Sequence, residues 1–196
     1  TEDAIALATK VAPYIDIIEL GTPLIKSEGL SAITAMKEAF PDKKVFADFK
    51  TADAGALEAE MAFKAGADYI TILGSIDDAT IIGAVEAAKK YDRAVVVDTI
   101  GVQDRVKRAQ EVSKLGVEFV ELHAGLDEQA KPGYSIDVLI EEASKAGVPV
   151  SIAGGVNINS IAKVKASGAV VAVAGGAIYG AEDPAAAAKE LKEALS

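Results

Sequence analysis

The sequence predicts an α/β protein with the (β/α)8 TIM-barrel fold, and three observations carry this prediction. Short apolar runs rich in β-branched residues recur along the chain, as is typical of parallel strands buried on both faces. Alanine-rich segments of helical periodicity separate these runs. The starts of successive runs lie 21 to 30 residues apart, which is the spacing of repeated βα units. We therefore expect a single domain over residues 1–196.

Seven strands are expected. They cover residues 15–21, 44–50, 68–74, 93–100, 119–125, 149–155 and 170–176. The alternative is a doubly wound open sheet, which normally carries a glycine-rich dinucleotide-binding turn after its first strand. No such turn follows residues 15–21, and the glycine pairs occur near the other end of the chain. The barrel is therefore favoured.

Eight helical segments accompany these strands. Thr1 stands in the capping position of the first, Ser27 is expected to begin the helix that ends before Pro41, and Asp77 begins another. Sequences such as KAGAD and KLGVE place a glycine where a helix ends and a strand follows. Because a helix precedes the first readable strand, the sequence is expected to be an N-terminally truncated barrel that lacks its first strand.

Composition excludes several classes of function. Twenty basic and thirty acidic residues give a net charge of −10, which argues against binding to nucleic acid or to anionic membranes. The absence of cysteine excludes disulfides and thiolate chemistry, and a single histidine excludes a multi-histidine metal site. With no long apolar stretch and no signal peptide, a cytoplasmic protein is expected.

Candidate site residues lie where the predicted strands end, because barrel active sites form at the carboxyl ends of the strands. Asp48 and Lys50 are two positions apart on one strand and point to the same side, and Asp53 follows in the loop. Glu19 ends the preceding strand. Glu19 and Asp48 together would suit a hard cation such as Mg²⁺. The alternative is a salt-bridge network at the barrel mouth.

Three further strand ends carry polar groups, at Thr71, Asp98 and Glu121. His123 follows Glu121 on the same side of its strand and is a candidate general acid or base. A packed polar histidine is the alternative interpretation. Two glycine pairs end the last two strands and are candidates for binding phosphate through backbone N–H groups. These are Gly154, Gly155, Gly175 and Gly176.

Several stretches together resemble the 3-hexulose-6-phosphate synthase family of the orotidine-monophosphate-decarboxylase superfamily. They are IIELGTPLI, ADFKTADAG, VELHAGLDEQA, SIAGGV and VAVAGGAIYGAEDPAAAAKEL. The resemblance covers essentially the whole chain, and the D-x-K-x-x-D motif is specific to the superfamily. It implies a TIM barrel of the ribulose-phosphate-binding type. It also implies a Mg²⁺-dependent aldol condensation of formaldehyde with D-ribulose 5-phosphate, giving D-arabino-3-hexulose 6-phosphate.

The same resemblance implies a role for each candidate residue. Glu19 and Asp48 would hold the metal, and Lys50 would hydrogen-bond the substrate. Asp53 would enter the partner's site across a homodimer interface, and His123 would move the proton at C1. The glycine pairs would bind the phosphate.

Two other functions stay open. One is a 3-keto-L-gulonate-6-phosphate decarboxylase, a relative that usually carries an arginine soon after the histidine, where this chain has none. The other is an inactive truncated or engineered barrel. Relatives begin with a strand whose aspartate points into the site, and this sequence lacks that strand. We therefore expect unpaired edges at the strands near Ile15 and Val170, which would be drawn together or covered by another chain.

Overall fold

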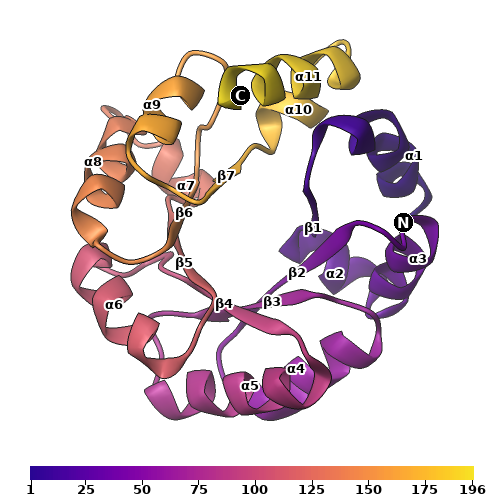
Figure 1. Cartoon of the computed structure of the whole chain (residues 1–196), viewed down its shortest axis with the longest axis vertical. Helices are drawn as coiled ribbons and strands as arrows, with labels where there is room; N and C mark the ends of the chain where they lie inside the picture. The colour runs from indigo at the N-terminus through magenta and orange to yellow at the C-terminus, as the bar shows by residue number, and fades with distance from the viewer.

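The computed structural model describes residues 1–196 and contains one seven-stranded parallel sheet. The strands follow one another in chain order, from β1 to β7, and each pairs only with its sequence neighbours. They are β1 (Ile17–Leu20), β2 (Lys44–Thr51), β3 (Tyr69–Leu73), β4 (Ala94–Asp98), β5 (Phe119–His123), β6 (Val150–Ala153) and β7 (Val171–Val173). All seven predicted strands are confirmed, and the sheet curls into an incomplete barrel (Figure 1).

Helices form a ring outside the curled sheet (Figure 1). The α-helices are α1 (Glu2–Val11), α2 (Thr22–Glu28), α3 (Ser31–Ala39), α4 (Gly55–Lys64), α5 (Asp78–Tyr91), α6 (Arg105–Val112), α7 (Leu126–Gln129), α8 (Asp137–Ala146), α9 (Ile161–Ala166), α10 (Gly176–Tyr179) and α11 (Pro184–Leu195). Two 3-10 turns extend α1 and α6, at Ala12–Tyr14 and Ser113–Leu115. None of the helices is long and apolar enough to cross a membrane.

The prediction that a helix begins at Ser27 is wrong. Ser27 lies inside α2, and Gly29 at φ +69° separates α2 from α3, which begins at Ser31. The positive φ turns the chain out of the helix, as glycine permits. Short helices such as α7 and α10 raise the number above the eight predicted segments, because a single turn carries too little periodicity to be read from sequence.

Other start and stop signals are confirmed. The Asp77 carboxylate accepts a hydrogen bond from the Ala79 backbone N–H and caps α5. Gly66 and Gly116 adopt positive φ where the chain turns into β3 and β5. Thr1 occupies the predicted capping position, but its hydroxyl donates to the Glu28 carboxylate instead of capping α1.

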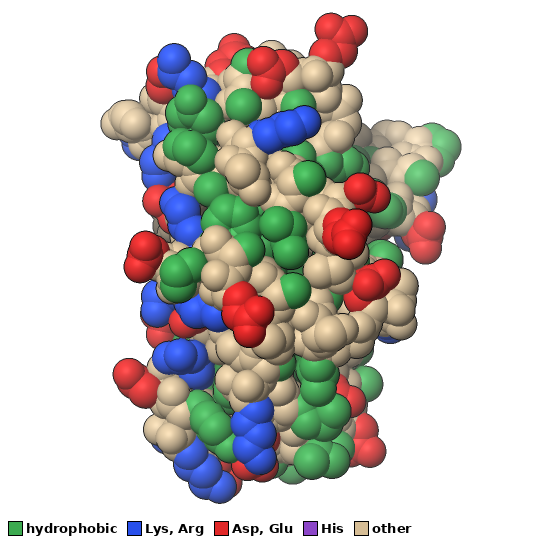
Figure 2. All heavy atoms as spheres, turned by 90° about the vertical axis from the view of Figure 1, so that its right-hand side faces the viewer, with side chains coloured by type: hydrophobic (Ala, Val, Ile, Leu, Met, Phe, Trp, Pro, Cys, Tyr) green, Lys and Arg blue, Asp and Glu red, His purple; other side chains and the backbone are tan.

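The main core lies between the sheet and its helices, in one cluster of 35 buried residues. A second, smaller cluster of Phe46, Val96 and Phe119 lies apart from it, on the inner side of the sheet. Burial on both faces explains why the strands read as near-continuous apolar runs. The outer surface between α1 and α3 mixes acidic, basic and hydrophobic side chains (Figure 2).

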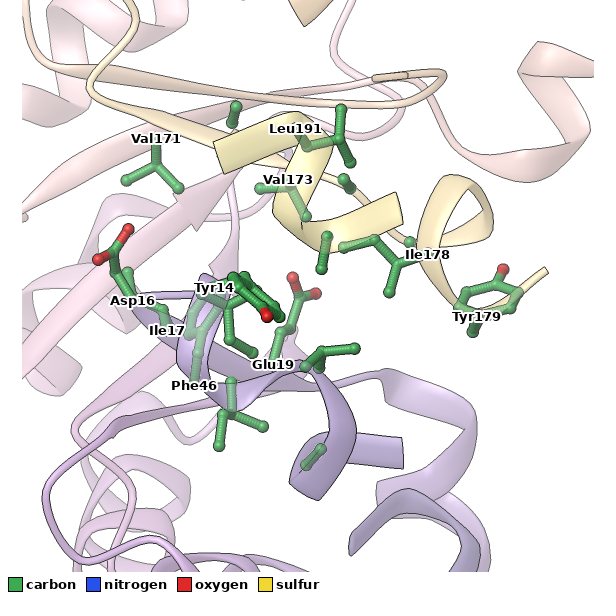
Figure 3. A pocket seen from close by; sticks show the side chains of 18 of the residues that line it. Tyr14, Asp16, Ile17, Glu19, Phe46, Val171, Val173, Ile178, Tyr179 and Leu191 are labelled. Atoms are coloured by element: carbon green, nitrogen blue, oxygen red, sulfur yellow. The ribbon is translucent and has the colours of Figure 1, made fainter. Parts of the chain in front are cut away.

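The barrel is open between β1 and β7. These strands are the two edges of the sheet and do not pair with each other, which confirms the predicted unpaired edges and shows that they do not close. A groove of about 680 Å³ runs between them. Side chains of β1 line one wall, and side chains of β7, α10 and α11 line the other (Figure 3). An ion pair between Lys192 and Asp16, at 2.6 Å, joins α11 to the chain just before β1.

Candidate active site

A polar layer lies above the small apolar cluster inside the barrel. Side chains two positions apart on a strand share a face, so the residues that follow Phe46, Val96 and Phe119 by two positions point into the same interior. They are Asp48, Asp98 and Glu121, and Glu19 and Thr71 stand in the same relation to Ile17 and Tyr69. The strand alternation thus places carboxylates from four strands at the carboxyl ends of the sheet.

Lys50 lies at the centre of this layer. Its ammonium group is 2.8 and 2.7 Å from the two oxygens of Asp48 and 3.0 Å from Oδ2 of Asp98. Burial opposes the ammonium form, but the charges of Asp98 and Asp48 outweigh it and raise the pKa of Lys50. The lysine therefore stays charged, and the prediction that Asp48 and Lys50 point to the same side is confirmed.

The backbone at Lys50 is strained. Its φ is +51°, and the register between β2 and β3 shifts between Ala47 and Thr51. The Lys50 N–H donates to the Thr71 hydroxyl at 2.9 Å, which helps to hold this conformation. A left-handed, non-glycine residue within a strand is typical of functional sites, where surrounding contacts maintain the strain.

Asp48 is fixed by two hydroxyl groups in addition to the lysine. The hydroxyl of Thr71 donates to Oδ1 at 2.9 Å, and that of Thr22, in the first turn of α2, donates to Oδ2 at 2.7 Å. Asp48 is only 6% exposed, so these bonds satisfy a carboxylate that water reaches poorly. Sequence reasoning missed Thr22, and its place at the start of a helix just after β1 was the available signal.

Asp98 links the lysine to the histidine. Its Oδ2 is 2.9 Å from Nδ1 of His123, and its Oδ1 accepts the Ile100 backbone N–H at 2.7 Å. Burial alone would raise the pKa of Asp98, but the hydrogen bond from His123 and the charge of Lys50 hold it below its usual value. An ionised carboxylate only accepts, so Nδ1 of His123 carries hydrogen and Nε2 is left as the basic nitrogen.

Glu121 lies deeper than His123 on β5. It is 1% exposed, its Oε2 is 3.6 Å from Nδ1 of His123, and its Oε1 has no hydrogen-bond partner. Burial and the charges of Glu19, Asp98 and Asp48 raise the pKa of Glu121 well above its usual value. Asp98 and Glu121 stood among the predicted strand-end groups, but the contact of Asp98 with His123 depends on the pairing of β4 with β5.

Glu19 points into the groove between β1 and β7 (Figure 3). Burial among protein atoms and the negative charge of Asp48 raise the pKa of Glu19 to about 7. The side chain is nevertheless open to the groove, where water weakens the effect of burial, and the charge of Asp48 still opposes ionisation of Glu19. A cation between Glu19 and Asp48 would relieve this repulsion, and the all-oxygen donor set fits Mg²⁺.

Asp53 lies outside this cluster. Its side chain is exposed just before α4, and its only hydrogen bond within the chain is from the Ala54 N–H, at 2.7 Å. Ala54 adopts φ +53° and turns the chain into the helix. The structure thus brings together Glu19, Asp48, Lys50 and His123 of the predicted catalytic and metal-binding residues, but not Asp53.

The glycine pairs lie at the same end of the sheet as His123. Ala153, which precedes Gly154, pairs in register with His123 on one side and with Val173 on the other. Gly154 has φ +123°, and a Cβ there would lie 2.6 Å from the carbonyl oxygen of Ala124. The Gly154 carbonyl accepts a bond from the Tyr134 hydroxyl at 2.7 Å. A second pair, Gly175 and Gly176, opens α10.

Parallel strands that end in a lysine, a histidine and several carboxylates, beside glycine turns, define a barrel enzyme for a small polar substrate. Residues 1–191 match the Orotidine 5'-phosphate decarboxylase / HUMPS family, and the chain belongs to this family.

Individual proteins of known name are also similar to this chain. The chain is 64% identical over 196 residues to a 3-hexulose-6-phosphate synthase of Mycobacterium gastri, covering 100% of this chain and 95% of that protein. It superposes on a crystal structure of 3-hexulose-6-phosphate synthase with a TM-score of 0.98 at 65% identity, covering 100% and 94% of the two chains. A crystal structure of 3-keto-L-gulonate-6-phosphate decarboxylase from Vibrio cholerae has a TM-score of 0.85 at 30% identity, covering 99% and 91%.

Proposed function

We propose that this chain catalyses the reaction of 3-hexulose-6-phosphate synthase, the aldol condensation of formaldehyde with D-ribulose 5-phosphate. Its high identity to proteins of that name over its whole length supports this function. The structural observation that carries the proposal is the connected series of charges from Asp48 through Lys50 and Asp98 to His123. It holds one basic nitrogen and one ammonium group at the mouth of the barrel.

His123 is the proton-transfer group in this proposal. Its Nδ1–H is held by Asp98, so Nε2 removes a proton from C1 of the sugar, beside the carbonyl. The resulting enediolate carbon attacks the carbonyl carbon of formaldehyde, a C–C bond forms, and the formaldehyde oxygen takes up a proton. The Lys50 ammonium donates to a substrate oxygen as negative charge develops on it.

Mg²⁺ is part of the proposal. Glu19 and Asp48 would hold it, and it would supply a Lewis acid that stabilises negative charge on the substrate oxygens. The mutual repulsion that raises the pKa of Glu19 supports this assignment. The glycine pairs would hold the sugar phosphate through backbone N–H groups. A Cβ at Gly155 or Gly176 would meet no atom closer than 3.7 Å, so a phosphate can approach the backbone at these two positions. Since phosphorylated sugars do not cross membranes freely, we place the reaction in the cytoplasm.

We also propose a homodimer in which Asp53 acts in the partner's site. Asp53 is exposed and makes no hydrogen bond or ion pair with the charged residues of its own site. The adjoining helix α4 carries exposed apolar side chains, Leu57 (61%) and Met61 (41%). Apolar groups of this kind at a surface are typical of interfaces.

Two inactive variants test the dimer. Asp53→Asn and His123→Gln proteins, unfolded together and refolded as an equal mixture, should recover about a quarter of wild-type activity. Half of the dimers are then mixed. In each mixed dimer one site combines the intact His123 of one subunit with the intact Asp53 of the other, and the second site lacks both. A refolded mixture that stays inactive, or a monomer in sedimentation, would contradict the proposal.

The decarboxylase alternative has a structural basis in the Vibrio cholerae relative. The arginine that these decarboxylases usually carry soon after the histidine is absent between His123 and Lys131. Arg105 does not replace it, because its guanidinium group is paired with Glu128 at 2.6 Å. The aldolase is therefore the better proposal.

One paired assay separates the three functions. Formaldehyde loss with D-ribulose 5-phosphate and Mg²⁺ is measured beside CO₂ release from 3-keto-L-gulonate 6-phosphate. Faster formaldehyde loss is expected. Faster CO₂ release would favour the decarboxylase, and a folded protein that is inactive in both assays would favour an inactive barrel.

A further inference from the structure

Asp98, Glu121 and His123 form a compact set of potential metal ligands. One donor atom from each lies within 4.8 Å of the other two. Asp98 and Glu121 are register partners on β4 and β5, and His123 lies two positions beyond Glu121. The set shares no residue with the Glu19–Asp48 pair, to which the preceding section assigns Mg²⁺.

A second observation points to a ligand at this place. Oε1 of Glu121 has no hydrogen-bond partner although the residue is 1% exposed. The hydroxyl of Ser151, which is the register partner of Glu121 on β6, is likewise buried and unpartnered. Buried polar atoms are nearly always satisfied by the protein, by ordered water or by an ion. A carboxylate oxygen is the most costly of these atoms to leave without a partner.

We propose that Asp98, Glu121 and His123 form a binding site for a borderline divalent cation such as Zn²⁺, distinct from the Mg²⁺ pair. The donor spacing suits such an ion. Oδ2 of Asp98 and Oε2 of Glu121 lie 2.9 and 3.6 Å from Nδ1 of His123. Ligands about 2.0–2.2 Å from a tetrahedral zinc ion lie about 3.3–3.6 Å apart, so the Glu121 spacing fits and the Asp98 oxygen moves away by a few tenths of an ångström. An imidazole nitrogen with two carboxylates selects Zn²⁺ or Co²⁺, whereas oxygens alone select Mg²⁺.

Lys50 limits the affinity of this site. Its ammonium group lies 3.0 Å from the same Asp98 oxygen that faces His123. A cation bound here shares Asp98 with a positive charge, so its affinity is weaker than that of structural zinc sites, which have no such competitor. The site is therefore a regulatory or inhibitory one, filled only when free Zn²⁺ rises.

Zinc at this site blocks the basic nitrogen of His123. A metal on Nδ1 displaces its hydrogen, and the neutral ring then carries hydrogen on Nε2. Nε2 becomes a donor and no longer accepts a proton from the sugar. This inhibition rests on the proposed function, whereas the metal site itself does not.

The single histidine makes the test direct. In ¹⁵N-labelled, metal-free protein without substrate, the imidazole nitrogens of His123 give one set of NMR signals. Titration with Zn²⁺ should shift the Nδ1 signal and fix hydrogen on Nε2, and Mg²⁺ should not. Unchanged His123 signals at saturating Zn²⁺ would overturn the proposal, whatever the activity of the enzyme.

Two isosteric variants assign the ligands. Glu121→Gln should weaken Zn²⁺ binding by at least about tenfold, on the scale seen when a metal site loses a supporting group. Glu19→Gln is the matched control and should bind Zn²⁺ like the wild type. Equal Zn²⁺ affinity in Glu121→Gln and wild type would overturn the site. If the enzyme is active and the His123 signals do not change with Zn²⁺, only the proposed zinc site is refuted. If the enzyme is inactive and Zn²⁺ binds to His123, only the proposed function is refuted.

Discussion

Oδ2 of Asp98 lies 2.9 Å from Nδ1 of His123, across the pairing of β4 with β5. This contact decides which ring nitrogen is basic, and it couples the histidine to Lys50 through a shared carboxylate. The side chain of His123 is 18% exposed, whereas that of Asp98 is fully buried. The imidazole of His123 is therefore partly open to the barrel interior and is held by a buried carboxylate.

Asp98→Asn should lower kcat by at least about 100-fold, the smaller end of the contribution of general base catalysis. Asparagine keeps the shape but offers an amide that can donate, so the tautomer of His123 is no longer fixed. The measurement is kcat together with exchange of the C1 proton in D₂O, and both should fall. Asp127→Asn, at an exposed position of α7, is the control. Unchanged exchange in Asp98→Asn would show that the contact has no part in proton transfer.

Gly176→Val should raise KM for D-ribulose 5-phosphate by about tenfold or more, equivalent to one good hydrogen bond to a charged group. A Cβ at Gly176 meets only the Tyr179 ring, at 3.8 Å or more, so the fold should tolerate the side chain. The comparison is between KM values for the phosphorylated sugar and for D-ribulose, alongside the melting temperature. Equal losses for both sugars would count against a phosphate site at this turn.

Glu121→Gln should stabilise the metal-free protein at pH 8 more than at pH 5. Because the folded-state pKa of Glu121 is raised, the folded protein binds a proton more tightly than the unfolded chain. The free energy of unfolding of the wild type therefore falls as the pH rises above about 4.5, the usual pKa of a glutamate. Glutamine removes this dependence.

The difference in the free energy of unfolding between Glu121→Gln and the wild type should therefore be larger at pH 8 than at pH 5. Urea unfolding in EDTA at the two pH values measures it. Parallel pH profiles for the two proteins would mean that Glu121 is charged at little cost.

A separate peptide should bind in the groove between β1 and β7. Both edges present unpaired backbone groups beside apolar side chains, and a strand added there would pair with both. An apolar peptide of about ten residues with one aspartate, at about 100 times its Kd, should stabilise the protein by about 2.7 kcal/mol. The melting temperature should then rise by several degrees. The same peptide with proline at alternate positions is the control, and an equal response to both would contradict strand addition.

The sequence predicts the strands and the Asp48–Lys50 pair because both follow from local periodicity. The two-residue spacing predicts that these side chains share a face. The structure confirms their contact at 2.7 Å, with a register shift at this point that simple alternation does not predict. The bond between Asp98 and His123 could not be predicted in the same way. It depends on the register of β4 against β5, which long-range packing sets. The left-handed backbone at Lys50 also departs from local preference, as functional residues often do.

The helix boundary at Gly29 shows a different limit. Ser27 is a good capping residue, but Pro23 in the first turn of α2 starts a helix earlier, and Gly29 ends it. Competing signals a few residues apart cannot be ranked from sequence alone. The role of Asp53 follows neither from local periodicity nor from helix start and stop signals, because Asp53 is proposed to act in a second subunit.

The most direct test of the proposed reaction follows the carbon of formaldehyde. ¹³C-labelled formaldehyde, D-ribulose 5-phosphate and Mg²⁺ are incubated with the wild type and with His123→Gln, and ¹³C NMR identifies the product. The account predicts that the label becomes the hydroxymethyl carbon of a hexulose 6-phosphate, bonded to the former C1, with the wild type only. Label that remains as hydrated formaldehyde with the folded wild type, or equal incorporation by His123→Gln, would contradict it.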